Sequence, residues 1–261
     1  MSIRERSPPP SEASSPAKIS AARRAQSSSK GWCVMDRPPK PSDALIQAIS
    51  QDLRPVRPSP QPLHLALRMG PLALLVSSLI LVAMGVRGDS STLGPLLTWG
   101  ASGGQFVLAI ALVWIAAHES TPAGRLPRQI VYSAAAGAFL VVLTITLLTF
   151  STSPTGGIAR DSRWIADVAC GLGSTIAGGI LILLFSRMFR NSVASRPTVA
   201  GALYGAGAGI AINAGWRMAC PVSTLRHALG AHGAAIIVTV LLGALIGRAL
   251  GSQRIHTSRS S

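Results

Sequence analysis

Six continuous apolar stretches of about 20 residues constrain the fold of this chain more than any other feature. A helix rises 1.5 Å per residue, so about 20 apolar residues cross the roughly 30 Å hydrocarbon core of a bilayer. The stretches are continuous and do not alternate, which excludes the strands of a membrane barrel. Only 13% of the residues are charged, against about 25% in soluble domains. The sequence therefore predicts an all-α, polytopic membrane protein with six transmembrane helices, at about 66–86, 96–118, 130–150, 164–186, 198–219 and 228–247.

The distribution of Lys and Arg predicts the orientation of these helices. From Met35 onward, thirteen basic residues lie on the side that would hold both termini, and five lie on the other side. Because cytoplasmic segments are enriched in Lys and Arg, we expect both termini in the cytoplasm. The bases are spread over loops and tails, so the net charge of +15 does not indicate direct nucleic-acid binding.

The ends of the chain differ in composition from the apolar part. Residues 1–34 are rich in Ser, Pro, Ala and Arg and are expected to form a disordered extension. Met35 opens a stretch that looks like an ordinary start, so we expect Met35 to be the initiator and 1–34 a misassigned start. The remaining divisions are a cytoplasmic tail at 35–65, a transmembrane domain at 66–248 and a second cytoplasmic tail at 249–261.

Residues 42–54 predict a short amphipathic helix in the cytoplasmic tail. Ser42 is a good N-cap, and Arg54-Pro55 ends the helix. A helix this short is not stable alone in water, so it needs a partner. The partner is either the bilayer surface or the bundle, or a groove on a soluble protein. One face of the helix carries the apolar side chains that would make this contact, Leu45, Ile46, Ile49 and Leu53.

Small residues predict where helices approach each other closely. Gly201, Gly205 and Gly209 recur every four residues in the fifth apolar stretch, and Gly243 and Gly247 do the same in the sixth. Such stripes allow two backbones to approach closely in a membrane. The bundle's own helices would use them, and a homodimer is the alternative. Asn213, in the same stretch, is expected to make a hydrogen bond between helices.

Metal-ligating and acidic side chains gather at the outer ends of the last three predicted helices. Their number there suggests a binding or sensing site. Two thiols, one carboxylate and two imidazoles fall there: Cys170, Cys220, Asp167, His227 and His232. Thiolate and imidazole suit zinc or copper(I), and two thiols in an oxidising periplasm could also form a disulfide. The simpler interpretations are a buried cysteine as apolar filler and a carboxylate at headgroup level.

Two details of this region bear on the structure. His227 and His232 are five residues apart, so they do not share a face of an α-helix unless the chain breaks near Gly230. Trp99, Trp164 and Trp216 lie at predicted outer ends, as expected of an interfacial aromatic belt.

Motifs for catalysis are absent from the sequence, which lacks a nucleophile elbow, an HExxH zinc motif and a Walker loop. We therefore do not expect an enzyme. No cofactor is certain, and a metal held by the thiols is the candidate. A small ion or solute transporter or channel is the alternative function. It would need polar residues along a path through the bundle, and Asp167, Asn213 and scattered Ser and Thr are what the sequence offers.

Several stretches together resemble the NrsF family of bacterial inner-membrane anti-sigma factors. They are DALIQAISQDLRPVRP before the first apolar stretch, Cys170, the glycine-rich stretch, and the Cys-Pro pair at Cys220 with the histidine that follows. The resemblance covers about 36–250. Many members carry a histidine directly before this cysteine, where the chain has Ala219, and this departure counts against a metal site.

This resemblance implies a function in transcription regulation. The cytoplasmic helix would sequester an extracytoplasmic-function sigma factor at the membrane, away from RNA polymerase. Cys170 and Cys220 match the family's pair of membrane cysteines, which would sense periplasmic metal or oxidant stress and release the sigma factor. Given Ala219, plain thiol chemistry is favoured over a metal site as the input.

Overall fold

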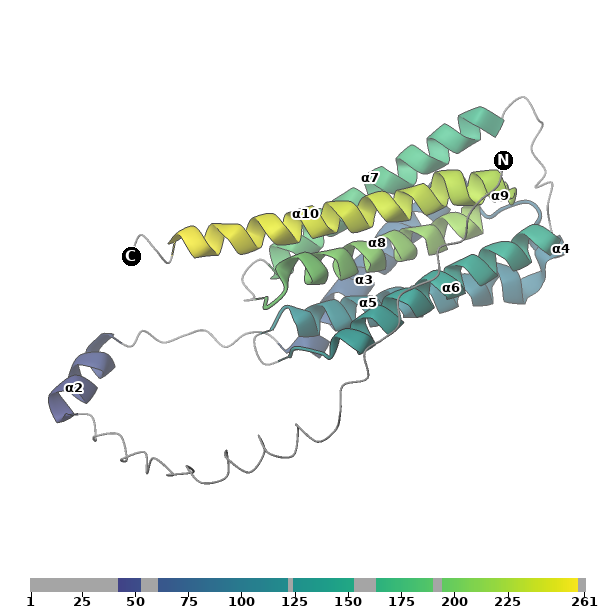
Figure 1. Ribbon diagram of the computed structural model, residues 1–261. Helices are drawn as coiled ribbons and strands as arrows, with labels where there is room; N and C mark the ends of the chain where they lie inside the picture. Colours follow the sequence, from purple (N-terminus) through teal and green to yellow (C-terminus); the bar gives the residue numbers. More distant parts are fainter. Residues whose placement is uncertain (1–41, 53–60, 122–123, 153–162, 190–193, 258–261) are drawn as a thin grey trace, which may run out of the picture. The chain divides into compact units, whose positions relative to one another are not determined.

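The computed structural model describes residues 42–52, 61–121, 124–152, 163–189 and 194–257. Every regular element within these ranges is a helix, as predicted (Figure 1). The chain divides into two units, 1–56 and 57–261, and each is described separately. The predicted extension 1–34, Met35 and Leu53 lie outside the described residues.

The second unit is a bundle of long helices (Figure 1). Five helices are long and apolar enough to cross a membrane, and they coincide with five of the six predicted spans. Short α and π segments extend two of them. The elements are α3 (Pro62–Met84), α4 (Ser90–Pro95), η2 (Leu96–Gly100), α5 (Ala101–Glu119), α6 (Arg128–Thr152), α7 (Arg163–Phe189), α8 (Pro197–Ala219), α9 (Leu225–His227), η4 (Ala228–Gly233) and α10 (Ala234–Thr257).

The fifth predicted span, 198–219, forms α8, which differs in character from the other five. It is a 23-residue helix, but its richness in Gly and Ala leaves it outside the five strongly apolar helices. It packs against α3, α5, α7 and α10, and most of its residues are buried. A helix enclosed by others meets little lipid, so small side chains that permit close packing serve it better than large apolar ones.

The closest helix contact in the bundle joins α8 to α10. Gly201 of α8 lies against Gly243 and Gly247 of α10, and a Cβ on any of the three would overlap the facing backbone. A Cβ on Gly205 would lie 2.9 Å from the Cα of Val240, and Gly209 faces Ile236. The predicted stripes thus face each other within one chain.

Several polar side chains buried in the bundle have hydrogen-bond partners on other segments. Asn213 Nδ2 of α8 donates to Gln105 Oε1 of α5 at 3.1 Å, as expected for Asn213. Ser77 Oγ of α3 donates to the carbonyl oxygen of Ala211 at 2.8 Å. At the opposite end of the bundle from Cys220, buried Glu119 accepts from Leu126 N at 2.9 Å.

The tryptophans correct one prediction. Trp99 and Trp164 are exposed, as a belt requires, but Trp216 is only 7% exposed. Its ring packs against α7, where a Cβ on Gly173 would lie 2.9 Å from Trp216 Cζ2. Trp216 is therefore a core residue, because α8 is enclosed by other helices where a peripheral helix would face lipid.

The first unit contains α2 (Asp43–Asp52), close to the predicted helix 42–54. Ser42 Oγ accepts from Leu45 N at 3.3 Å, the expected N-cap. Leu45 and Ile46 are each 51% exposed. Ile49 belongs to the same helix.

The contact between α8 and α10 generates a prediction about two glycines. Gly205→Ala should lower the free energy of unfolding by about 1–3 kcal/mol, because the methyl group overlaps the backbone of α10. Gly137→Ala, on α6, should be neutral or stabilising, because a Cβ there meets open space and Ala favours a helix by up to about 1 kcal/mol. Reversible unfolding in mixed micelles measures both; equal effects of the two changes would contradict the packing account.

Candidate functional site

Four buried side chains from different parts of the sequence converge at one end of the bundle. They form the thiol–imidazole cluster, defined as Cys170, Cys220, His227 and His232. Cys170 Sγ lies 3.6 Å from Cys220 Sγ, and Cys220 Sγ lies 3.2 Å from His227 Nε2. His227 Nε2 lies 3.2 Å from His232 Nε2. All four ligand atoms lie within 4.8 Å of one another.

Two helices and a loop place these side chains. On α7, Asp167, Cys170 and Ser174 are spaced at three and four residues, so they share one face of the helix. Cys220 follows the last residue of α8, and its N–H donates to Trp216 O at 2.6 Å. Pro221 cannot continue the helix, which turns the chain at the cysteine.

A π-helical segment brings the two histidines together. An α-helix would separate residues five apart, and the sequence analysis expected the two histidines to share a face only if the chain broke near Gly230. The structure has no break there; the chain widens into η4 (Ala228–Gly233). A π-helix pairs residues i and i+5 through its backbone, so His227 and His232 project to the same side. Their ring centroids are 4.9 Å apart.

The outer nitrogens of both histidines have partners that orient the rings. Asp167 Oδ1 lies 2.6 Å from His227 Nδ1, and Ser174 Oγ lies 3.5 Å from His232 Nδ1. Both Nε2 atoms therefore face the thiols. A carboxylate on the far nitrogen of an imidazole is the arrangement that fixes the ring and raises the basicity of a metal-ligating histidine.

Hydrogen bonds from neighbouring side chains affect the acidity of Cys220. The hydrogen bond from Cys170 lowers the pKa of the Cys220 thiol, and hydrogen bonds with His227 and His232 act in the same direction. Thiolate is the form that binds metals and reacts with oxidants. Cys220 is therefore the side chain of the cluster best suited to carry negative charge.

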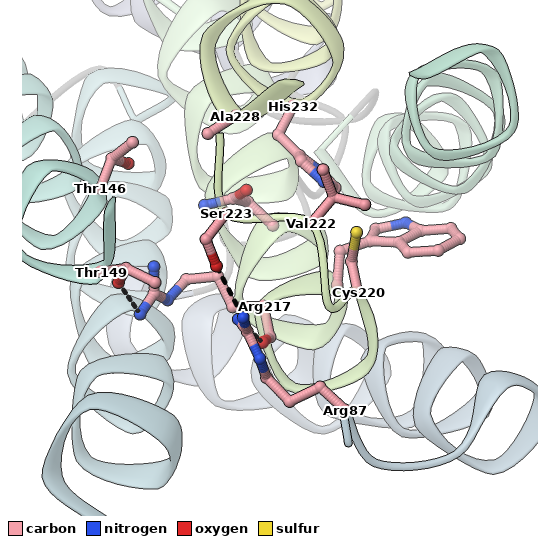
Figure 2. A pocket seen from close by; sticks show the side chains of 11 residues that line it. Arg87, Thr146, Thr149, Arg217, Cys220, Val222, Ser223, Ala228 and His232 are labelled. Carbon is pink, nitrogen blue, oxygen red and sulfur yellow. Dashed lines mark hydrogen bonds between the residues drawn. The ribbon is translucent and has the colours of Figure 1, made fainter. Parts of the chain in front are cut away.

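Arg87, which the sequence analysis did not single out, fastens the loop after Cys220. Its N–H donates to Met218 O at 2.9 Å, and its guanidinium donates to Ser223 Oγ at 2.7 Å and to Asp89 at 2.6 and 2.8 Å. Figure 2 shows Arg87 and Ser223 joined across the loop. The sequence contained a signal for this residue. Arg87 and Arg217 are two of the five basic residues on the predicted outer side of the membrane, where basic residues are less common.

The distances fit a tetrahedral metal. Zn–S bonds of about 2.3 Å and Zn–N bonds of about 2.0–2.1 Å separate neighbouring ligand atoms by about 3.3–3.8 Å. The measured separations of 3.6, 3.2 and 3.2 Å are close to these values. Both thiols are free, and their sulfurs are also near enough for a disulfide after a small shift.

The structure brings all five sequence-predicted residues of this region together, four as possible ligands and Asp167 behind His227. The predicted packing glycines lie elsewhere, between α8 and α10. Leu45, Ile46 and Ile49 belong to α2 in the other unit.

Comparison with known proteins gives one family and no individual relative. No curated protein and no solved structure matches the chain significantly. The family model described as negative regulator of sigma F matches residues 49–251, most of the chain. The chain therefore belongs to the NrsF family of negative regulators of sigma F, as the resemblance in its sequence predicted.

Proposed function

We propose that this protein is an inner-membrane anti-sigma factor that sequesters an extracytoplasmic-function sigma factor and releases it when the thiol–imidazole cluster binds a metal. Membership in the NrsF family supports regulation of a sigma factor. The convergence of four buried ligand atoms within 4.8 Å carries the sensing part of the proposal. Buried polar groups of this kind are costly in a membrane and mark functional sites.

The proposed topology has six spans, of which α8 is the fifth in chain order. A 23-residue helix is long enough to cross the bilayer, and its neighbours shield it from lipid. With both termini in the cytoplasm, the cluster lies at the periplasmic ends of α7, α8 and α10. The count of thirteen basic residues against five supports this orientation.

The proposed output is α2. Its apolar residues Leu45 and Ile46 are half exposed, and a ten-residue helix gains too little from its own hydrogen bonds to persist alone. An amphipathic helix with an apolar face fits a groove on a soluble partner. The sigma factor is the partner that the family membership supports.

The proposed input is a zinc or copper(I) ion held by two thiolates and two imidazoles. Tetrahedral sites with these ligands suit both ions. The ligand atoms lie within 4.8 Å, against about 3.3–3.8 Å in a closed zinc site, so ligation requires a contraction of up to about 1 Å. The absence of a histidine at Ala219 matters less here, because His227 and His232 already supply two imidazoles.

The contraction would be passed on through α8 and α10. Cys220 ends α8, and His227 and His232 begin the helix that continues as α10. The two helices meet through backbone at Gly201, Gly243 and Gly247, so a shift of one moves the other. Release of the sigma factor requires that the protein with the shifted bundle bind the sigma factor less tightly than the protein with the unshifted bundle.

Two other functions are less well supported. A disulfide between Cys170 and Cys220 would also contract the cluster, but it uses the histidines only to favour the Cys220 thiolate, whereas a metal uses all four side chains as ligands. Nothing in the comparisons supports a transporter. In the described part of the bundle, the polar side chains Asn213, Gln105 and Ser77 pair with partners on neighbouring helices.

A prediction about metal content tests the input. The full-length protein in lipid nanodiscs should bind one zinc ion per chain, detected by equilibrium dialysis and atomic spectroscopy. Cys170→Ser and Cys220→Ser should each abolish this binding, because a hydroxyl is a poor zinc ligand. Asp167→Asn should weaken it by about 10–100-fold, since the carboxylate that orients His227 is lost.

His64→Gln is the control, because it removes an exposed imidazole of α3 that is not part of the cluster. It should bind zinc like the unaltered protein. Undiminished zinc binding by the Cys170→Ser/Cys220→Ser double variant would contradict the site. A Cys170–Cys220 disulfide in protein that binds no zinc would favour the oxidant version.

A prediction about α2 tests the output. Replacing Leu45, Ile49 and Leu53 together by Gln should abolish co-purification of the sigma factor encoded beside this gene, because the apolar face is lost. Replacing Gln47, Ser50 and Gln51 by Ala should leave capture intact, because these residues occupy the opposite face. Equal capture by both triple variants would rule out docking through the apolar face of α2.

A further inference from the structure

Arg87 holds the end of α8 as well as the loop that follows it. The last four carbonyl groups of an α-helix have no partner within the helix. Two of these in α8 accept from Arg87: Met218 O accepts from its backbone N–H at 2.9 Å, and Arg217 O accepts from Nη1 at 3.3 Å. Beyond Cys220, Arg87 Nη2 donates to Ser223 Oγ at 2.7 Å (Figure 2). Arg87 therefore contacts the chain on both sides of Cys220.

The loop that Arg87 holds joins two ligands of the thiol–imidazole cluster. Cys220 lies three residues before Ser223, and His227 lies four residues after it. Thr224 is the N-cap of the short helix α9, where its Oγ1 accepts from His227 N at 3.4 Å. Arg87 thus holds the middle of a segment whose two ends must approach the other ligands when a metal is bound.

The position of Arg87 is fixed relative to the end of α3. The helix ends at Met84, and the N–H of Gly85 donates to Leu81 O at 2.9 Å. Gly85 has a φ of 77°, which glycine adopts readily at the end of a helix. Asp89 accepts from Arg87 Nε at 2.6 Å and from Nη2 at 2.8 Å, and this two-point contact orients the guanidinium. Arg87 is only 4% exposed, so it forms a rigid connection between α3 and the loop.

The chain enters the bundle from the cytoplasmic tail through α3. Residues 53–61 join α2 to α3 in the sequence, and α3 runs without a break from Pro62 to Met84. It also packs closely on α8, where a Cβ on Gly215 would lie 2.9 Å from Ser77 O. Tightly packed helices shift as units, so a displacement at the outer end of α3 reaches its first turn.

We propose that Arg87 couples the cluster to α3, so that α3 carries the metal-bound state of the cluster to the tail that holds the sigma factor. This inference rests on the proposed function and names the path from its input to its output. When Cys220 and His227 move toward a metal, the loop between them moves as well. Arg87 follows the loop, because a buried guanidinium that stayed behind would leave its donors without acceptors.

The ratio of two dissociation constants tests the coupling. The Kd of a labelled sigma factor for the full-length protein in nanodiscs is measured by anisotropy, with saturating zinc and without zinc. The unaltered protein should give a ratio of about ten. Arg87→Gln should still bind zinc, because every ligand remains, but its ratio should fall to about one. A purely structural role of Arg87 would change both dissociation constants alike and leave the ratio at about ten.

A milder variant decides the matter if Arg87→Gln fails to fold. Ser223→Ala removes one acceptor of Arg87 and spares the ligands, so it should lower the ratio to about three. Arg226→Gln and Ser91→Ala alter exposed residues of the same two types and should keep the ratio at about ten.

Two results would overturn the coupling through Arg87. One is a ratio of about ten in both Arg87→Gln and Ser223→Ala, and the other is loss of zinc binding in both, which would show that Arg87 only positions the ligands. Failure of the proposed function looks different, because the unaltered protein itself would then bind no zinc or show the same Kd with and without it. That result would remove the coupling as well.

Discussion

The close contact between α8 and α10 is the constraint on which both the fold and the site depend. Gly201, Gly243 and Gly247 remove side chains from the interface, so the two backbones touch. This contact fixes the end of α8 relative to the start of the segment leading into α10. Cys220 lies at the first of these positions and His227 and His232 at the second, so the packing of glycines in the bundle determines the spacing of ligands at its end.

A second constraint is the cost of burying polar groups inside an apolar bundle. Each histidine of the cluster is satisfied on both ring nitrogens, by a partner on α7 and by the facing ligands. The loop after Cys220 is held in the same manner by the hydrogen bonds of Arg87. Among the described residues, five buried side-chain atoms lack a hydrogen-bond partner: Gln105 Nε2, Glu119 Oε2, Arg196 Nε, Trp216 Nε1 and Arg217 Nε.

Much of this arrangement follows from the sequence. Helical class and five strongly apolar helices follow from the apolar stretches, and the glycine spacing anticipates the α8–α10 contact. The residues of the cluster were recognisable from ligand chemistry and from their shared end of the bundle.

Three details of the structure could not be predicted from the sequence. The π-helical turn depends on packing, since nothing in ALGAHG distinguishes it from an α-helix. Burial of Trp216 depends on the central place of α8, and the role of Arg87 depends on a contact across 136 residues. The geometry also shifts the preferred input from plain thiol chemistry to a metal, because two oriented imidazoles complete the ligand set.

The central claim is that metal at the cluster weakens the hold on the sigma factor. The most direct test is the Kd of a fluorescently labelled sigma factor for the nanodisc-embedded protein, measured by anisotropy with and without zinc. The account predicts that zinc raises this Kd by about tenfold or more, within the usual range of coupling between sites, and that Cys170→Ser/Cys220→Ser removes the effect. An unchanged Kd with one zinc ion bound per chain would contradict it.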